Sequence, residues 1–148
     1  MIRLAQANDL RDIKACAELA YARYVPVIGR KPAPMVADFS AQIAAGKIFV
    51  ATNDQATFQG FIVFYAEHEH MLLENVAVLP SAAGRGVGRA LINFCEHTAR
   101  HQRMKAVHLY TNAKMTENLA IYTKLGYVKV GQRIEEGFER VFFEKSVF

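Results

Sequence analysis

The sequence predicts an α/β fold, a mixed, mostly antiparallel sheet of about six to seven strands flanked by about four helices. A strand–helix–strand step over residues 72–111 indicates a central parallel pair, because parallel neighbours need a crossover between them. Apolar runs within 48–66, before this step, and 128–144, after it, are typical of hairpins. The 148 residues, 52% hydrophobic and 22% charged, suit a single domain over 1–148.

The first third of the chain predicts a short strand and two helices. The strand covers 2–4, and Asn8 or Asp9 can cap a helix that runs to about Tyr24. Three prolines and a glycine make 25–35 a loop. A short helix follows over about 36–45, and Gly46 is placed to end it.

The rest of the chain alternates strands and helices. Pro80 stops the strand 72–79, and the helix that follows turns Leu91 and Cys95 toward the sheet and Glu96 outward. The remaining expected elements are strands over 48–52, 58–66 and 107–111, a helix over 115–125, and a hairpin of 128–134 and 138–144.

Composition narrows the class of protein. The net charge is +4, but lysine and arginine are scattered without a basic run, so we expect no nucleic-acid partner. No stretch approaches the roughly 18 apolar residues of a membrane span, so we expect no membrane partner. The N-terminus lacks a signal-peptide pattern, which favours the cytoplasm. Cys16 and Cys95 fall in apolar helical patterns and are expected to be buried free thiols.

A glycine-rich segment separates the strand 72–79 from the next helix. Glycines alternate at Gly84, Gly86 and Gly88, with Arg85 and Arg89 beside them. Glycine lets an anion approach the backbone, and a helix start offers unpaired N–H groups and a positive dipole end. The segment therefore predicts a site for a phosphate or pyrophosphate.

Two familiar phosphate loops do not fit this segment. A P-loop needs Lys-Ser/Thr after its last glycine, and none follows. A dinucleotide-binding turn needs Gly-x-Gly-x-x-Gly directly after a strand, whereas the loop residues 80–83 precede Gly-x-Gly-x-Gly here. A purely structural turn at a strand–helix corner remains the alternative.

Two motifs together resemble the GNAT superfamily of N-acetyltransferases. The strand 73–78, Pro80 and the run 84–91 resemble its acyl-coenzyme-A signature. The run 118–127, with Tyr122 before Leu-Gly-Tyr, resembles its second signature. The resemblance, which covers nearly the whole chain, implies a GNAT-like fold, acetyl-CoA as cosubstrate, and direct transfer to a primary amine in a ternary complex. The alternative is a non-catalytic acyl-CoA-binding sensor or interaction module.

The cofactor-binding residues that the resemblance implies lie in the strand, the loop and the second motif. They are Val76, Ala77, Val78, Gly84, Arg85, Gly86, Val87, Gly88, Arg89 and Asn118. The chain departs from the family at Ala83, where Gln or Arg is usual, and at Met115, where a coenzyme-contacting Asn is usual. We expect Arg85 and Arg89 to supply the missing cation, with weakened coenzyme affinity, and Asn118 to take over the polar contact.

Two residues are the catalytic candidates. Tyr122 resembles the family's thiolate-protonating residue, and a phenol has a suitable pKa range for that step. The alternative, which the helical periodicity alone favours, is that Tyr122 is only a packed aromatic residue before the helix end. Glu74 lies mid-strand among apolar residues and is the candidate base, with a salt bridge to Lys or Arg as the alternative.

The acceptor and the assembly are less defined. Tyr21, Tyr24, Met35 and Phe138 are candidates for the acceptor pocket and equally for the core. Glu67, Glu69, Glu135 and Glu136 favour a cationic amine, carried by a small molecule, a peptide or a protein. The spacing of His68 and His70 is not that of a helical zinc motif and no further ligands cluster nearby in the sequence, so we expect no metal. The aromatic C-terminal strand is a candidate to pair with a second copy in a homodimer, and the sequence leaves the oligomeric state open.

Overall fold

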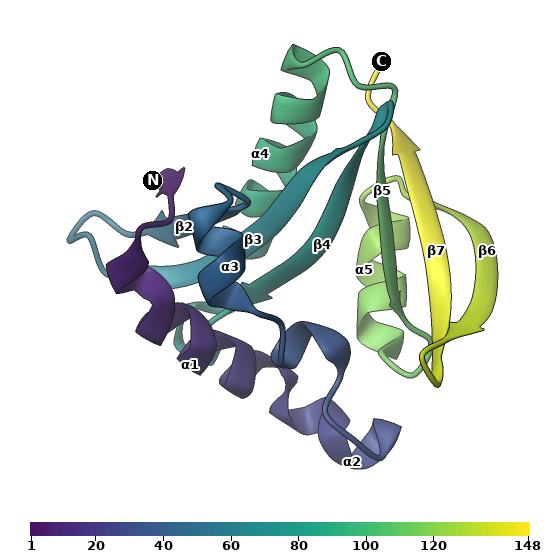
Figure 1. Ribbon diagram of the computed structural model, residues 1–148, viewed down its shortest axis with the longest axis horizontal. Coiled ribbons are helices and arrows are strands. Elements are labelled where there is room, and N and C mark those ends of the chain that lie inside the picture. Colours follow the sequence, from purple (N-terminus) through teal and green to yellow (C-terminus); the bar gives the residue numbers. More distant parts are fainter.

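The computed structural model describes residues 1–148, and its centre is one seven-stranded sheet (Figure 1). Its strands are β1 (Ile2–Leu4), β2 (Ile48–Thr52), β3 (Phe58–Glu67), β4 (His70–Val78), β5 (Ala106–Asn112), β6 (Val128–Glu135) and β7 (Phe138–Ser146). The spatial order is β1-β2-β3-β4-β5-β7-β6, and β4–β5 is the parallel pair. The predicted mixed sheet with a central parallel pair is confirmed.

Helices cover both faces of this sheet. They are α1 (Leu10–Tyr21), the single-turn α2 (Val25–Ile28), α3 (Phe39–Ala44), α4 (Val87–His101) and α5 (Thr116–Lys124). Apolar residues of α1 and α3 pack on β2 and β3 in one core cluster. Apolar residues of α4 and α5 pack on the opposite face in a second cluster, which also includes β5 and β7. α1 and α4 each bury one apolar face, as the sequence predicted.

The N-terminal segment is more helical than predicted. The expected loop 25–35 contains α2 and a 3-10 turn at Ala33–Met35. Pro26 lies in the first turn of α2, where a missing N–H and a fixed φ are tolerated. The predicted helix 36–45 begins only at Phe39, because the Asp38 side chain caps it by accepting from the Ala41 N–H at 3.1 Å.

One side chain of α4 was predicted wrongly. Leu91 and Cys95 are buried against the sheet as expected, but Glu96 is also buried, at 5% exposed. Tyr127 and Lys145 each donate a hydrogen bond to its carboxylate at 2.9 Å. These partners, distant in sequence, make the buried charge tolerable.

The two halves of the sheet separate in the middle. β4 pairs with β5 only from His70 to Leu73. On the other side of β4, Val63 pairs with Asn75 and Phe64 with Leu73, so Glu74 is an extra, bulged residue. Figure 1 shows β4 and β5 side by side at the top and diverging toward the bottom of the view.

The C-terminal strand is not the free edge of the sheet. β7 pairs with β5 on one side and β6 on the other, so the expectation that this strand pairs with a second copy is wrong. The exposed edge on this side belongs to β6. No helix has both the length and the apolar character needed to cross a membrane.

Candidate active site

The glycine-rich segment forms an open turn at the start of α4. After the 3-10 turn Pro80–Ala82, Gly84 and Gly86 have φ of +79° and +77°, in the left-handed region that favours glycine. The backbone N–H groups from Gly84 to Arg89 donate no backbone hydrogen bond. The first α4 bond is donated by Ala90 to Gly86 O, at 2.9 Å. These free donors, at the positive end of a 15-residue helix, line a cradle whose chemistry suits an anion.

A groove of about 810 Å³ leads from this cradle to α5. Nine of the ten predicted cofactor-binding residues line it, namely Val76, Ala77, Val78, Gly84, Gly86, Val87, Gly88, Arg89 and Asn118. The tenth, Arg85, is exposed and does not line the groove. Arg23 and Lys124 also line it, and sequence reasoning missed both. Arg23 is paired with Glu117 at 2.9 Å, so Arg89 and Lys124 are the cations without an ion pair.

The backbone of β4 is partly free where it borders the groove. Leu79 N–H donates to Gln59 O at 2.9 Å, and residues opposite each other alternate between bonded and non-bonded pairs. Val76 and Val78 therefore stand at positions that exchange no backbone hydrogen bonds with their opposite residues in β3. Their N–H and C=O groups point away from β3. Because β5 has diverged here, these groups face the opening between the strands.

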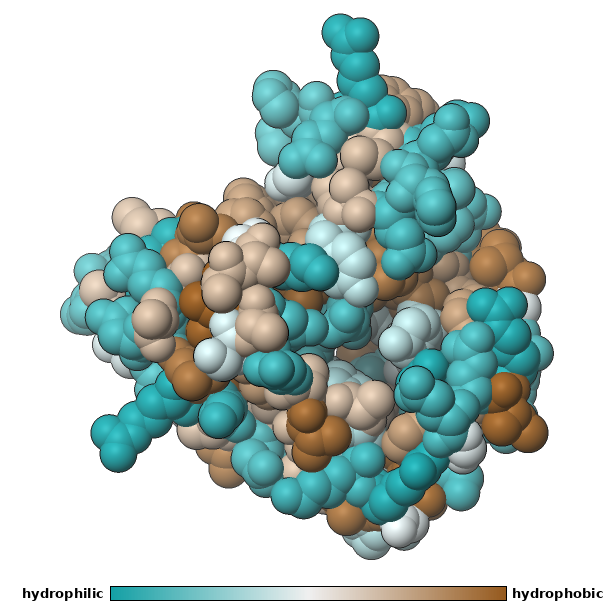
Figure 2. All heavy atoms as spheres, viewed as in Figure 1, coloured by the Kyte–Doolittle hydropathy of each residue, from teal (hydrophilic) through white to brown (hydrophobic).

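A second cavity, of about 290 Å³, lies at the same opening. It is lined mainly by polar and aromatic side chains, including Glu74, Asn75, Tyr110, Asn112, Glu136, Phe138 and Arg140. Tyr21, Val76, Asn118 and Tyr122 line both the groove and this cavity. The surface is hollowed between the N-terminal helices and the β6–β7 hairpin (Figure 2). The two spaces meet at the divergence of β4 and β5.

Tyr122 lies at this meeting point. Its side chain packs against the rings of Tyr127 and Phe143 and is 7% exposed. Burial raises the pKa of Tyr122 well above its ordinary value, because the phenolate would lose solvation. The phenol is therefore neutral at physiological pH and keeps a proton to donate.

Glu74 is held at the bulge by two neutral donors. The Gln42 side-chain amide, from α3, donates to one carboxylate oxygen, and Tyr65 OH donates to the other at 2.9 Å. Burial and this hydrogen bond raise the pKa of Tyr65, so it stays a donor. Glu74 makes no salt bridge to Lys or Arg, the alternative that the sequence left open. Its carboxylate faces the second cavity.

The consecutive residues Glu74 and Asn75 both reach the face covered by α1 and α3, which is a consequence of the bulge. Tyr21 OH donates to Asn75 Oδ1 at 2.6 Å and lies 3.1 Å from the Val76 carbonyl oxygen. The Asn75 amide donates to Pro34 O at 2.9 Å. This network fixes α1 and the 33–35 turn against β4.

The other predicted pocket residues divide between site and core. Phe138 lines the second cavity with Tyr21, and Tyr24 lines the groove. Met35 belongs to the core on the α1 side. Asn118 makes only long contacts, 3.5 Å to Thr111 Oγ1 and 3.6 Å to Met115 Sδ, so its amide is available to a ligand.

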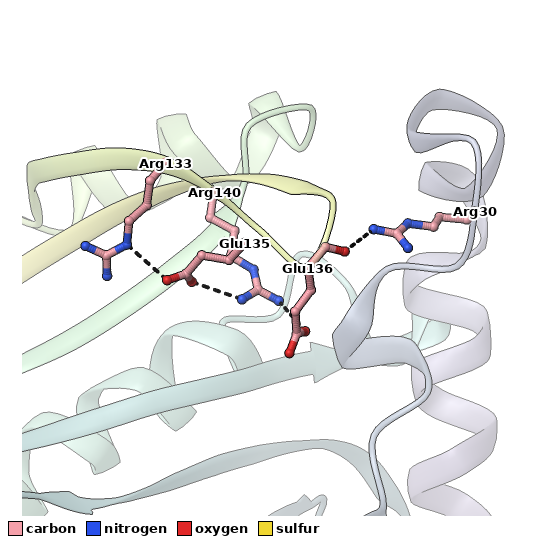
Figure 3. A network of polar contacts seen from close by, with 5 residues as sticks. All are labelled: Arg30, Arg133, Glu135, Glu136 and Arg140. Atoms are coloured by element: carbon pink, nitrogen blue, oxygen red, sulfur yellow. Dashed lines mark hydrogen bonds and ion pairs between the residues drawn. The ribbon is translucent and has the colours of Figure 1, made fainter.

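A charged network closes the far side of the second cavity (Figure 3). The buried Arg140 pairs with Glu135 at 3.1 Å and with Glu136 at 3.6 Å. Arg30, just after α2, donates to the Glu136 carbonyl oxygen at 2.6 Å. Its guanidinium lies 3.6 Å from the centre of the Phe138 ring. The N-terminal segment thus touches the β6–β7 turn across the cavity.

The four carboxylates predicted near the acceptor do not gather in one place. Glu136 lines the cavity, and Glu135 pairs with Arg140 beside it. Glu69 instead forms an ion pair with Lys105 at 2.9 Å, and Glu67 lines a different hollow. The acidic residues at the cavity are therefore Glu74 and Glu136.

Sequence reasoning missed Asn75, Tyr110 and Arg140 in the cavity. Asn75 follows Glu74 directly, and a polar pair interrupting an apolar strand was a usable signal for the bulge. Arg140 carries no such signal, because only the pairing of β5 with β7 brings it to Tyr110.

The comparison with protein families gives one match. A family model described as "Acetyltransferase (GNAT) domain" covers residues 44–129, more than half of the chain. This range holds β2 to β5, the glycine-rich segment, α4 and α5.

Relatives give further matches. The mycothiol acetyltransferase of Jonesia denitrificans is 30% identical over 89 residues, which are 59% of this chain and 28% of that protein. The chain thus corresponds to about a quarter of this curated relative's length.

Solved structures match over nearly the whole chain. The PaiA N-acetyltransferase of Thermoplasma acidophilum, in complex with coenzyme A, has a TM-score of 0.79 at 15% identity and covers 99% of this chain and 98% of its own. Ard1 of Thermoplasma volcanium has a TM-score of 0.77 at 19% identity, with coverages of 100% and 97%. At these identities the likeness concerns the fold.

Proposed function

The chain belongs to the GNAT acetyltransferase family, and we propose that residues 1–148 act as one acetyl-CoA-dependent N-acetyltransferase domain. The observation that carries this proposal is that the groove and the second cavity share Tyr21, Val76, Asn118 and Tyr122. A cosubstrate in the groove and an acceptor in the cavity would meet there. Transfer can then be direct, with both bound at once.

The groove suits coenzyme A at both ends. The free N–H groups from Gly84 to Arg89 suit a pyrophosphate, and Arg89 and Lys124 add positive charge. The open edge of β4 at Val76 and Val78 suits an amide-bearing arm, which hydrogen-bonds like an added strand. A solved protein of similar fold is in complex with coenzyme A.

Acetyl-CoA supplies the acetyl group as a thioester. An outward N–H group of this β4 edge that does not bind the arm would stabilise the negative charge that develops on the acetyl oxygen. Glu74 accepts a proton from the acceptor ammonium, directly or through water, which frees the nitrogen lone pair. Tyr122 donates its proton to the departing sulfur, and the second proton that the nitrogen loses as the amide forms returns to the Tyr122 oxygen directly or through water, while Glu74 releases its proton to solvent. No cysteine is placed for an acetyl-enzyme, because Cys16 and Cys95 are buried in the core.

The acceptor is a primary amine, and the cavity favours one that carries positive charge. Glu74 lines the cavity without an ion pair, whereas Glu135 and Glu136 pair with Arg140, so Glu74 is the carboxylate that attracts a cation. Tyr110 and Phe138 give the amine's carbon chain an aromatic surface. Small amines and peptide or protein amines both remain within this class. We also propose a cytoplasmic setting, since both cysteines are free thiols.

The direct test is thiol release from acetyl-CoA with a panel of diamines, amino acids, peptides and a lysine-rich protein. At least one amine should give steady thiol release and an acetylated product. This product should be about 42 Da heavier than the amine, because an acetyl group replaces one hydrogen. Double-reciprocal plots should intersect, as a ternary complex requires. Parallel lines would contradict direct transfer. Tight acetyl-CoA binding without release from any amine would favour the non-catalytic sensor.

A further inference from the structure

Three metal-ligand side chains meet on the sheet outside the proposed active site. His70 begins β4, His108 lies in β5, and Glu144 lies in β7. One ligand atom from each lies within 4.8 Å of the other two. His70 and His108 belong to the paired segments of β4 and β5, which run side by side near the top of Figure 1. Sequence reasoning found no further ligand near His70, because strand pairing brings the other two from 38 and 74 residues away in the chain.

The cluster is positioned by three adjacent backbones. His108 is directly opposite Glu144 in the β5–β7 register, and its Nε2 is 2.8 Å from Glu144 Oε1. The His70 and His108 rings are stacked, with centroids 3.9 Å apart and planes 22° apart. The His70 side chain has no hydrogen-bond partner in the protein, so both of its ring nitrogens are free for a ligand.

We propose that His70, His108 and Glu144 bind Zn²⁺. Two imidazoles and one carboxylate form a ligand set of intermediate hardness, which suits zinc. Mg²⁺ and Ca²⁺ instead prefer oxygen ligands alone. Zinc–ligand bonds of about 2.0–2.2 Å require one imidazole to turn out of the stack, because a bound ion lies in the plane of each ring that holds it. The side chains of His108 and Glu144 are 37% and 42% exposed, so an ion can reach them, and a water completes a tetrahedral shell.

Zinc here would fasten the junction between the two halves of the sheet. The two halves are joined only where His70–Leu73 of β4 pairs with Ala106–Leu109 of β5. An ion held by β4, β5 and β7 crosslinks both halves beside that junction. Because binding to the folded state alone adds stability, zinc should raise the melting temperature.

The chain offers a competing histidine pair that serves as the control. His97 and His101 are exposed and lie four residues apart on α4, so both imidazoles share one helix face. His97→Ala removes that pair and leaves the three-strand cluster intact. His108→Ala removes the cluster and leaves the helix pair.

The experiment is calorimetric titration of the purified chain with ZnCl₂, alongside thermal unfolding with and without zinc. The proposal predicts one tight site, and zinc at a hundredfold excess over its dissociation constant raises the melting temperature by about 5–10 °C. His108→Ala and Glu144→Gln should weaken zinc binding at least about tenfold and abolish the shift, whereas His97→Ala should leave both unchanged. If His108→Ala unfolds, Glu144→Gln decides the matter, since it keeps the side-chain size.

No tight zinc binding by the unaltered chain would overturn the proposal. So would binding that is lost in His97→Ala and kept in Glu144→Gln. Neither outcome depends on acetyl transfer, because both readouts are binding and unfolding.

Discussion

Tyr122 shows how one side chain acquires its proposed role from its surroundings. Tyr122→Phe removes the hydroxyl and keeps the ring that packs on Tyr127 and Phe143. We expect turnover to fall about 100-fold or more, because the departing sulfur loses its proton donor. The dissociation constant for acetyl-CoA should stay nearly unchanged. Steady-state kinetics and equilibrium binding measure the two quantities.

Tyr127→Phe is the matched control for this change. It removes a neighbouring buried hydroxyl that bonds to Glu96 and lines neither cavity. This variant should lose stability, since Glu96 keeps only Lys145 as a partner, but it should keep its turnover. Unreduced turnover in Tyr122→Phe would remove that residue from the mechanism.

Glu74 is tested through the pH dependence of the reaction. Glu74→Gln keeps the shape of the side chain and removes its capacity to accept a proton. We expect the largest loss of kcat/KM at low pH, where the acceptor is mostly an ammonium and needs a base. The gap should narrow as the pH approaches the pKa of the amine. A pH–rate profile that keeps its shape in the variant would discard Glu74 as the base.

For single residues, the sequence predicted the site residues that belong to a motif. It missed those that reach the site only through contacts between distant parts of the chain. Tyr122 and the loop glycines were identifiable because the motif depends on neighbours in the chain. Arg140 was not, because its partners Glu135 and Tyr110 meet it through strand pairing. The burial of Glu96 was missed because its partners Tyr127 and Lys145 are distant in the sequence and meet it only when α4 packs on the sheet.

At the scale of elements, the turn before α4 depends on backbone that only glycine adopts easily. Gly86→Ala places a Cβ at φ +77°, which costs about 1–2 kcal/mol. The exposed turn can relax when empty, so coenzyme binding must restore the strained form. We expect acetyl-CoA affinity to weaken roughly tenfold in a titration.

Gly46→Ala separates this effect from general strain. Gly46 has φ +71°, has open space around it, and follows α3 outside both cavities. It should lower stability by a similar amount and leave acetyl-CoA affinity intact. Equal affinity in the unaltered chain and Gly86→Ala would contradict the proposed role of the cradle.

The start of α1 is held by a pH-dependent contact. Arg3 donates to both oxygens of Asp9, at 2.8 and 3.0 Å, and the Gln6 N–H donates to one of them at 2.7 Å. The Arg3 hydrogen bonds, above all, lower the pKa of Asp9 below its ordinary value of 3.8. A lowered pKa adds stability above the unfolded value, and this stability is lost as the pH falls through the folded value.

Asp9→Asn should therefore destabilise the chain at pH 7 and make little difference near about pH 2. The Arg3 side chain is 40% exposed, which keeps the expected loss at about 1 kcal/mol. Urea unfolding at the two pH values measures it. A loss of equal size at both would show that the charge of Asp9 is not the cause.

Element types were predictable and element ends were not. The apolar periodicities of β2 to β7 and of α4 identified each element, because they reflect which face is buried. The start of β4 at His70 rather than residue 72 was not visible, since pairing with Glu67 extends it. The single turn α2 was hidden by prolines that usually break helices but are tolerated in a first turn.

At the scale of the whole molecule, the site exists because the sheet divides. The bulge at Glu74 ends the pairing of β4 with β5, and the opening joins the groove to the second cavity. The sequence predicted the parallel pair but not its early end, because a bulge depends on how β3 pairs with β4. The contact of Arg30 with the β6–β7 turn likewise joins segments 106 residues apart.

The central claim is direct acetyl transfer where the groove meets the second cavity, and a crystal structure of the chain with acetyl-CoA tests it most directly. We predict the pyrophosphate on the N–H groups of Gly84 to Arg89 and the arm along Val76 and Val78. The thioester sulfur should lie within hydrogen-bonding reach of the Tyr122 hydroxyl, at the junction of the two cavities. A coenzyme bound elsewhere, or a thioester directed away from the second cavity, would contradict direct transfer at this site.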